Sequence, residues 1–165
     1  QPLLQNYDDL LNLNVDYIFH ATGTGGTMAG LAAGRKMAES DTKIISITVS
    51  PKDEKYLRKV EKLANDVLAL IKSPAHVTIE EDLHMDTGYY APGYEQPNEA
   101  ASEAIRLLAR TEGLFVDPVY TGKALAGLID YVRSGKVPQG SNVVFWHTGG
   151  ATALFAEHEI LGKLY

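Results

Sequence analysis

Three short apolar runs, separated by segments with helical spacing, constrain the fold of this chain most strongly. They are residues 16–21 (DYIFHA), 44–49 (IISITV) and 142–146 (NVVFW). Each run is nearly continuous in apolar residues, which is typical of strands buried on both faces of a parallel sheet. The sequence therefore predicts an α/β fold with three layers and a mostly parallel sheet.

Between these runs, apolar residues recur at helical spacing. We expect helices at 3–13, 28–39, 53–72, 97–110 and 123–133, and a last helix after residue 150. A further short strand is expected at 76–79, and a long loop with glycine, proline and tyrosine at 82–98. The chain has no internal repeat and no linker, so we expect one domain over 1–165.

Composition excludes several classes of protein. With 45% hydrophobic and 22% charged residues, the 165-residue chain is not of the disordered type. A net charge of −6 argues against nucleic acid as a partner, and no apolar run approaches the length of about 18 residues that a membrane span needs. Cysteine is absent and the five histidines lack ligand spacing, so we predict no metal site.

The loop 22–27 (TGTGGT) between the first strand and its helix is the sharpest candidate site. Glycines let successive backbone N–H groups point the same way, and the following helix adds a positive dipole end, so the loop can hold a phosphate. The dinucleotide fingerprint fails because residue 28 is Met, and the Walker lysine is absent. A tight strand-to-helix turn is the alternative interpretation.

Other candidates are weaker. His147-Thr148-Gly149-Gly150 also follows a strand, and His147 by itself favours a structural role. Tyr94 and Tyr120 lie in loops with glycine and proline, where a hydroxyl can act as an acid or base or simply pack. The lysine- and arginine-rich run at 52–62 favours a solvated helix face over a phosphate patch.

Three segments together resemble a known family: ATGTGGTMAGLAAG, YEQPNEAASEAIRLLARTEGLFVDPVYTGKALAGL and FWHTGGATALFA. They are similar to the fold-type-II pyridoxal-phosphate enzymes of the D-cysteine desulfhydrase and 1-aminocyclopropane-1-carboxylate deaminase group. The resemblance implies an incomplete large domain of the tryptophan-synthase-β type and pyridoxal 5′-phosphate as cofactor. It also implies a small amino-acid substrate, and a cytoplasmic homodimer in the full-length enzyme.

The resemblance also assigns roles to residues. The cofactor phosphate falls on Thr22, Gly23, Thr24, Gly25, Gly26 and Thr27. Tyr120, in the DPVY segment, and Tyr94, in the Tyr-x-x-Pro-Asn-Glu segment, match tyrosines that approach substrate and cofactor, which makes them the catalytic candidates. Thr148 matches the hydroxyl beside the pyridine nitrogen in the desulfhydrase branch. A hydroxyl there makes the cofactor a milder electron sink than a carboxylate would.

Two positions separate the branches of this group. The deaminase pattern has Glu after the tyrosine of the Val-Tyr motif and Leu in the later His-x-Gly-Gly motif, whereas this chain has Thr121 and Thr148. Both favour β-elimination of D-cysteine to pyruvate, ammonia and hydrogen sulfide. Ring opening of 1-aminocyclopropane-1-carboxylate and release of sulfite from L-cysteate remain alternatives.

The family's Schiff-base lysine lies in an Asn-Lys-x-Arg-Lys segment, which none of the ten lysines here matches. We therefore expect the chain to be the C-terminal part of a longer enzyme, with that lysine before Gln1, and to be inactive by itself. A non-catalytic domain that binds a phosphate ligand or a partner is the alternative from another class. A nicotinamide-dependent oxidoreductase is a third interpretation, which the glycine spacing disfavours.

Overall fold

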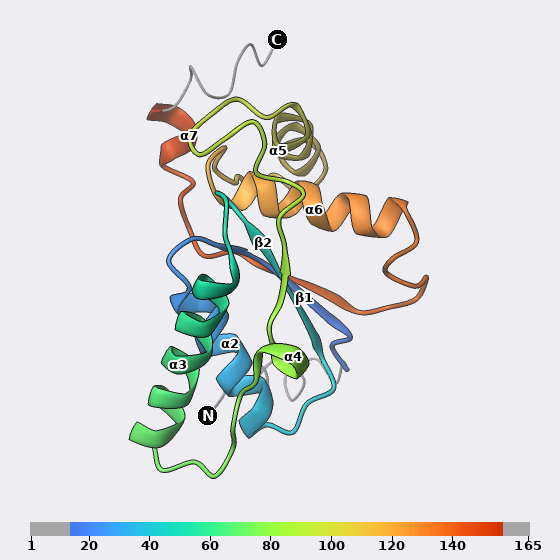
Figure 1. Ribbon diagram of the computed structural model, residues 1–165. Coiled ribbons are helices and arrows are strands. Elements are labelled where there is room, and N and C mark those ends of the chain that lie inside the picture. Colours follow the sequence, from blue (N-terminus) through green and yellow to red (C-terminus); the bar gives the residue numbers. More distant parts are fainter. Residues whose placement is uncertain (1–13, 157–165) are drawn as a thin grey trace.

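The computed structural model describes residues 14–156 and has a four-stranded sheet at its centre (Figure 1). The strands are β1 (Tyr17–Thr22), β2 (Lys43–Thr48), β3 (His84–Asp86) and β4 (Val143–Trp146). All pair in parallel, in the order β3-β2-β1-β4. The parallel sheet and the three strands expected from the apolar runs are thus confirmed.

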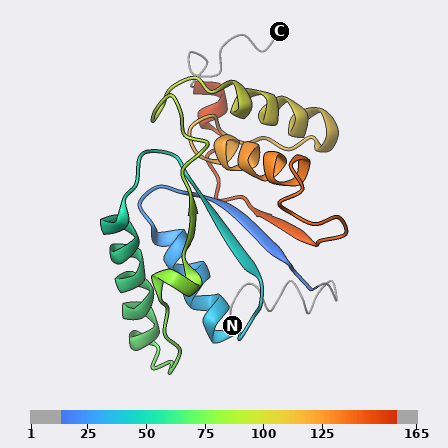
Figure 2. The same ribbon diagram turned by 45° about the vertical axis from the view of Figure 1, so that its right-hand side comes forward.

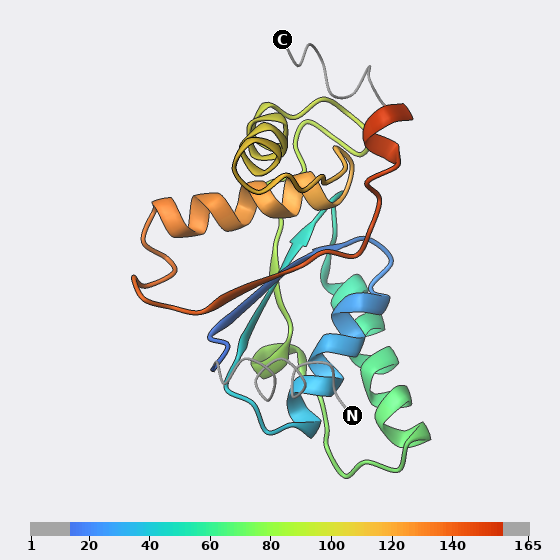
Figure 3. The same cartoon turned by 180° about the vertical axis from the view of Figure 1, so that it is seen from behind.

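Helices cover both faces of the sheet, which gives the three layers (Figures 1 and 2). On one face lie α2 (Gly26–Met37), α3 (Glu54–Leu70) and the short α4 (Ile79–Asp82). On the other lie α5 (Glu99–Glu112), α6 (Thr121–Arg133) and the short α7 (Ala153–Ala156). Seen from behind, β4 runs along the edge of the sheet between these two layers (Figure 3).

The core is divided by the sheet, as alternation along β1 requires. Ile18 packs with Leu31 of α2, whereas Phe19 faces the opposite layer and packs with Ala124 of α6. The helix α6 lies close to the strands, because a Cβ added at Gly127 would come within 2.8 Å of Ile47 Cδ1.

Helix ends follow the chemistry of the sequence. The Asp53 side chain accepts a hydrogen bond from the N–H of Tyr56 at the start of α3 (3.1 Å). The Asn98 side chain caps α5 in the same way through Ala101 (2.8 Å), and Gly113 ends that helix with a φ of 67°. The two capped helices begin and end within two residues of the expected bounds.

The strand expected at 76–79 is wrong. Residues 76–78 are not part of a strand, α4 begins at Ile79, and the strand beside β2 is His84–Asp86. Asn65 of α3 satisfies the backbone of Val77 on both sides, since its amide donates to the carbonyl and accepts from the N–H (2.9 Å each). A side chain thus replaces a strand partner. The helix expected at 3–13 lies outside the described residues.

Candidate functional site

The glycine loop leaves the carboxyl end of β1 and leads into α2. Gly25 is the residue before α2, and its φ of 102° is a left-handed conformation that glycine adopts readily. No side chain caps this helix end, and its first turn holds no acidic residue. The first amides of α2 are therefore open to an anion, where the helix dipole is positive.

The loop is pressed against α3, which explains why a glycine stands at its centre. A Cβ at Gly25 would lie 2.7 Å from Val60 Cγ2, closer than carbon atoms pack. Beside it, the hydroxyls of Thr22 and Tyr56 are 2.8 Å apart in a hydrogen bond. A Cβ at Gly26 would meet nothing within 4 Å, so the space next to that residue is open.

A cavity of about 380 Å³ opens beside this loop. Its lining includes Gly23, Thr24, Lys52, Lys59, Tyr94 and Tyr120. Among the described residues that line it none is acidic. The cavity therefore combines backbone and hydroxyl donors with two cations at the carboxyl end of the sheet, where α/β folds place their ligands.

The basic run at 52–62 is divided by the structure. Arg58 pairs with Glu54, and Lys62 pairs with Asp66, each at 2.6 Å on the exposed side of α3. Lys52 instead lies with its Nζ 4.8 Å from the ring centre of Tyr56, at the cavity. The solvated face predicted from the sequence thus describes only part of the run. Because α3 begins just after β2 ends, the other part reaches the cavity.

Tyr94 and Tyr120, which sequence reasoning treated as separate candidates, lie together at the cavity. Their hydroxyls are hydrogen-bonded, and their rings meet edge to face with centres 6.0 Å apart. The ring of Tyr120 also touches the glycine loop, since a Cβ at Gly23 would lie 3.5 Å from Tyr120 Cε1. The hydrogen bond to Tyr120 raises the pKa of Tyr94 to about 12, so this phenol stays protonated at neutral pH.

Asp117 fixes the backbone that carries Tyr120. Its buried carboxylate accepts hydrogen bonds from the N–H groups of Val119, Tyr120 and Thr121 at 2.7–2.9 Å, and from the Thr121 hydroxyl at 2.6 Å. A Cβ at Gly150 would lie 2.7 Å from the same carboxylate, so the loop after β4 packs against it. Sequence reasoning missed this residue, although an Asp followed by Pro is a common start of a turn.

Thr148 leaves the sheet at the same edge as the glycine loop. Trp146, the last residue of β4, pairs with His20 of β1. Thr148 and Thr22 each lie two residues further along the chain, so both lie at the carboxyl end of the sheet. Thr148 is exposed and does not line the cavity. Both ring nitrogens of His147 bond to backbone groups: Nδ1 accepts from the N–H of Gly149 (3.0 Å), so Nε2 carries the proton and donates to the Phe115 carbonyl (2.8 Å). These contacts fit the structural role that the sequence context favours.

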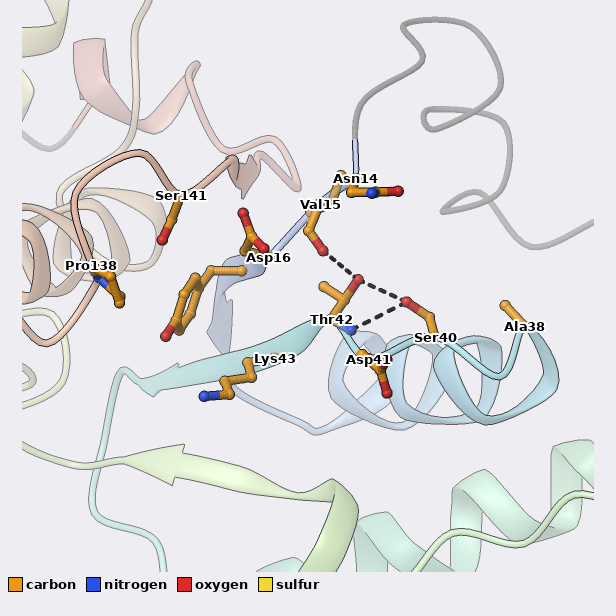
Figure 4. A pocket seen from close by; sticks show the side chains of 11 residues that line it. Asn14, Val15, Asp16, Ala38, Ser40, Asp41, Thr42, Lys43, Pro138 and Ser141 are labelled. Atoms are coloured by element: carbon orange, nitrogen blue, oxygen red, sulfur yellow. Dashed lines mark hydrogen bonds between the residues drawn. The ribbon is translucent and has the colours of Figure 1, made fainter.

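A larger cavity of about 660 Å³ lies at the opposite edge of the sheet, by the amino ends of β1 and β2 (Figure 4). Thr42 is tied there to the Val15 carbonyl (2.7 Å) and to the Ser40 hydroxyl (2.8 Å). The lining brings no candidate residue from the sequence, and it lies away from the carboxyl ends of the strands. Across residues 14–156, no group of three or more histidine or acidic side chains could hold a metal ion, and no helix is long and apolar enough to cross a membrane.

Comparison with known proteins places this geometry in a family. Residues 5–149 match the family described as pyridoxal-phosphate dependent enzyme. The chain belongs to this family. As a member of the pyridoxal-phosphate dependent enzymes, which use pyridoxal phosphate as cofactor, it shows the expected fold type II.

Relatives within the family point to one group. The chain is 40% identical over 159 residues to a D-cysteine desulfhydrase of Salmonella typhi, covering 94% of this chain and 46% of the relative. It is 42% identical over 150 residues to the D-cysteine desulfhydrase of Yersinia enterocolitica, covering 89% of this chain and 44% of that one. The chain thus spans about half the length of the relatives it matches.

Solved structures agree with this placement. A structure described as an ACC deaminase homologue superimposes with a TM-score of 0.83 at 30% identity, over 96% of this chain and 46% of that one. The processed form of threonine deaminase isoform 2 from Solanum lycopersicum superimposes with a TM-score of 0.54 at 17% identity, over 94% of this chain and 44% of that one, and shows the fold alone.

The residues at the cavity fit the family's cofactor. A phosphate monoester needs amide donors and positive charge, and the uncapped start of α2 with Lys52 and Lys59 offers both. The volume of about 380 Å³ lies in the range of small-molecule sites.

Proposed function

We propose that this chain is the C-terminal portion of a pyridoxal-phosphate-dependent lyase and supplies the half that holds the cofactor's phosphate and pyridine ring. The proposed reaction is β-elimination of D-cysteine to pyruvate, ammonia and hydrogen sulfide. The observation that carries the proposal is the meeting of Gly23, Tyr94 and Tyr120 at one cavity. Identity of 40–42% to two D-cysteine desulfhydrases supports the choice of substrate.

The cofactor, when bound, withdraws electrons from the substrate's α-carbon, so that a proton and the β-thiol can leave. Within the chain, residues 22–27 bind the phosphate through backbone amides and threonine hydroxyls. Lys52 and Lys59 offset its charge from the rim of the cavity. Thr148 would serve the pyridine nitrogen, where a hydroxyl donates or accepts without imposing a full charge.

The two tyrosines hold a proton at the reacting end. The hydrogen bond to Tyr120 raises the pKa of Tyr94 to about 12, so the hydroxyl keeps its proton at neutral pH and can both donate and accept hydrogen bonds. Tyr120 is the partner that lies against the glycine loop. The pair could therefore donate one proton to the departing thiolate, giving hydrogen sulfide, and the phenol that gave it would be reprotonated from solvent.

The substrate is tested by giving D-cysteine to a longer protein that contains this chain and measuring sulfide and pyruvate. Equal amounts of both products are expected. Absence of both from a protein with bound cofactor would reject D-cysteine. Sulfite from L-cysteate, or 2-oxobutanoate from 1-aminocyclopropane-1-carboxylate, would place the chain in the alternative branches.

The role of Tyr120 is tested in the same protein with Tyr120→Phe. We expect turnover to fall by about 100-fold, the usual contribution of a proton-transferring side chain, while the cofactor stays bound. Tyr17→Phe, which removes a phenol hydroxyl at the opposite end of the sheet, is the matched control. Unchanged turnover in Tyr120→Phe removes this phenol from the mechanism.

Binding experiments with this chain alone test whether residues 22–27 form a phosphate site, the phosphate cradle. We expect the 165 residues to bind pyridoxal phosphate more tightly than pyridoxal, which lacks the phosphate, and to give no borohydride-reducible adduct. Equal affinity for the two compounds contradicts a phosphate site at residues 22–27. A reducible adduct at one lysine contradicts the expectation that the essential lysine lies outside this chain.

A further inference from the structure

Lys123 of α6 is a fully buried lysine for which the proposed reaction has no use. Its exposed fraction is 0%, which is rare for a side chain that carries a charge. The Nζ donates hydrogen bonds to the backbone carbonyls of Gly93 (2.7 Å) and Tyr90 (3.2 Å). In the part of the chain that the structure describes, no carboxylate forms an ion pair with it.

The acceptors of these bonds belong to the loop that carries a catalytic candidate. Gly93 directly precedes Tyr94, so the ammonium holds the peptide that aims this tyrosine. The start of the same loop is held by Asn98, whose amide donates to the carbonyls of Tyr89 (3.1 Å) and Ala91 (2.5 Å). Lys123 thus does for the Tyr94 end of the loop what Asn98 does for its start.

The other tyrosine is fixed by the same short segment. Asp117, six residues before Lys123, is 0% exposed and holds the backbone N–H of Tyr120 at 2.7 Å. The Asp117 carboxylate accepts its hydrogen bonds from residues 119–121. It therefore attracts Lys123 through space and not by direct contact. The segment 117–123 therefore holds the backbone at both tyrosines, through Asp117 at Tyr120 and through Lys123 at the residue before Tyr94.

Burial also excludes a covalent role for this lysine. With no exposed surface and its hydrogens directed at two carbonyls, the Nζ offers no approach to an aldehyde in the cavity. Burial lowers the pKa of Lys123, and either protonation state of the amine can donate to the two carbonyls. The group is a donor to backbone, not a nucleophile.

We propose that Lys123 is a positioning residue that sets Tyr94 against Tyr120 through the carbonyl of Gly93. The proposal rests on the proposed function for its purpose, since the pair matters only where the two phenols face cofactor and substrate. Its geometric claim stands apart from catalysis and can be tested without cofactor.

The test uses the absence of cysteine from the chain. Lys123→Cys introduces the sole thiol, which is alkylated in denaturant to carry either an aminoethyl group or a propyl group, and the protein is then refolded. The aminoethyl form restores an ammonium at nearly the length of lysine, whereas the propyl form has the same length without charge or donors. Lys55→Cys, on the exposed part of the basic run, receives the same two treatments as the matched control.

The readout is oxidative coupling of the two phenols into dityrosine, mapped by mass spectrometry to the peptides of Tyr94 and Tyr120. We expect the propyl form at position 123 to couple at least fivefold less than the parent, and the aminoethyl form to recover the parent yield. Both forms at position 55 should couple as the parent does. Circular dichroism confirms that each form is folded.

Parent-like coupling in the folded propyl form overturns the proposal, and so does failure of the aminoethyl form to restore it. If the propyl form does not fold, Lys123→Gln replaces it, because its polar amide is uncharged and ends one bond short of the lysine nitrogen, so that we do not expect it to reach the Gly93 carbonyl. The same fivefold loss is then expected, and parent-like coupling again overturns the proposal. A positive result with an inactive longer protein would leave the positioning role standing and reject the proposed function.

Discussion

Acid should weaken this fold through His20, a buried histidine in the middle of β1. Its Nδ1 donates to the Ala21 carbonyl (2.9 Å) and its Nε2 accepts from the Ser46 hydroxyl (2.7 Å), so the neutral ring is fully bonded. Burial lowers the pKa of His20 from 6.5 to about 4. Between pH 6.5 and about 4, His20 is protonated in the unfolded chain but neutral in the folded one. The free energy of unfolding therefore falls as the pH falls through this range.

The size of the effect comes from this difference in pKa. Each unit corresponds to about 1.4 kcal/mol, so a fall from 6.5 to about 4 amounts to about 3 kcal/mol once the pH is below 4. At pH 5 about 2 kcal/mol is already lost, and above pH 7.5 the contribution is close to nil. Since domains have a free energy of unfolding of roughly 5–15 kcal/mol, this loss is large.

The assay is urea unfolding at pH 7.5, 6 and 5 for the parent, His20→Gln and His76→Gln. The carboxylates titrate in all three proteins, so the pH-dependent difference between parent and variant isolates one histidine. We expect His20→Gln to be less stable at pH 7.5 but to lose about 2 kcal/mol less than the parent by pH 5. The exposed His76 variant should follow the parent. Parallel curves for the parent and His20→Gln would refute the reasoning.

Two further predictions concern the phosphate cradle. Gly25→Ala should lower the free energy of unfolding by about 2–4 kcal/mol in urea titrations, because the methyl group overlaps Val60 and φ is 102°. Gly26→Ala should change the free energy of unfolding by less than about 1 kcal/mol but weaken the binding of pyridoxal phosphate. Unchanged affinity in Gly26→Ala would mean that the phosphate does not approach residue 26. Lys52→Gln and Lys59→Gln should each weaken the binding of pyridoxal phosphate about two- to fivefold at low salt, and less at high salt, in equilibrium titrations. The control Lys55→Gln should leave the affinity unchanged. Equal effects at all three positions would indicate that the net charge of the protein, and not a specific site, attracts the phosphate.

The sheet could be predicted because β1, β2 and β4 are nearly continuous apolar runs in the sequence. The fourth strand, β3, could not be predicted. His84–Asp86 has one apolar residue, so nothing in it distinguishes a strand from a loop, and its pairing depends on β2. The nearby 76–79 resembled a strand more closely, but Asn65 supplies its hydrogen bonds instead. Local pattern fails where a distant side chain decides the backbone.

The site was predictable residue by residue but not as an assembly. The glycine loop and both tyrosines stand out in the sequence, yet the contact between Tyr94 and Tyr120 joins positions 26 residues apart. Lys123 reaches 30 residues back to Gly93, and no spacing rule predicts such a bond. The two lysines gave no spacing signal, because Lys59 lies on α3 whereas Lys52 precedes that helix.

The buried bond between Thr121 and Asp117 limits how this scaffold can change its substrate. Thr121 is fully buried and donates to the Asp117 carboxylate at 2.6 Å, whereas the deaminase pattern, from which this chain departs, has Glu at that position. A second carboxylate there would face the first inside the core, which costs several kcal/mol unless one is neutralised. In this chain, a glutamate at position 121 is therefore expected to destabilise the fold unless Asp117 or its surroundings change as well.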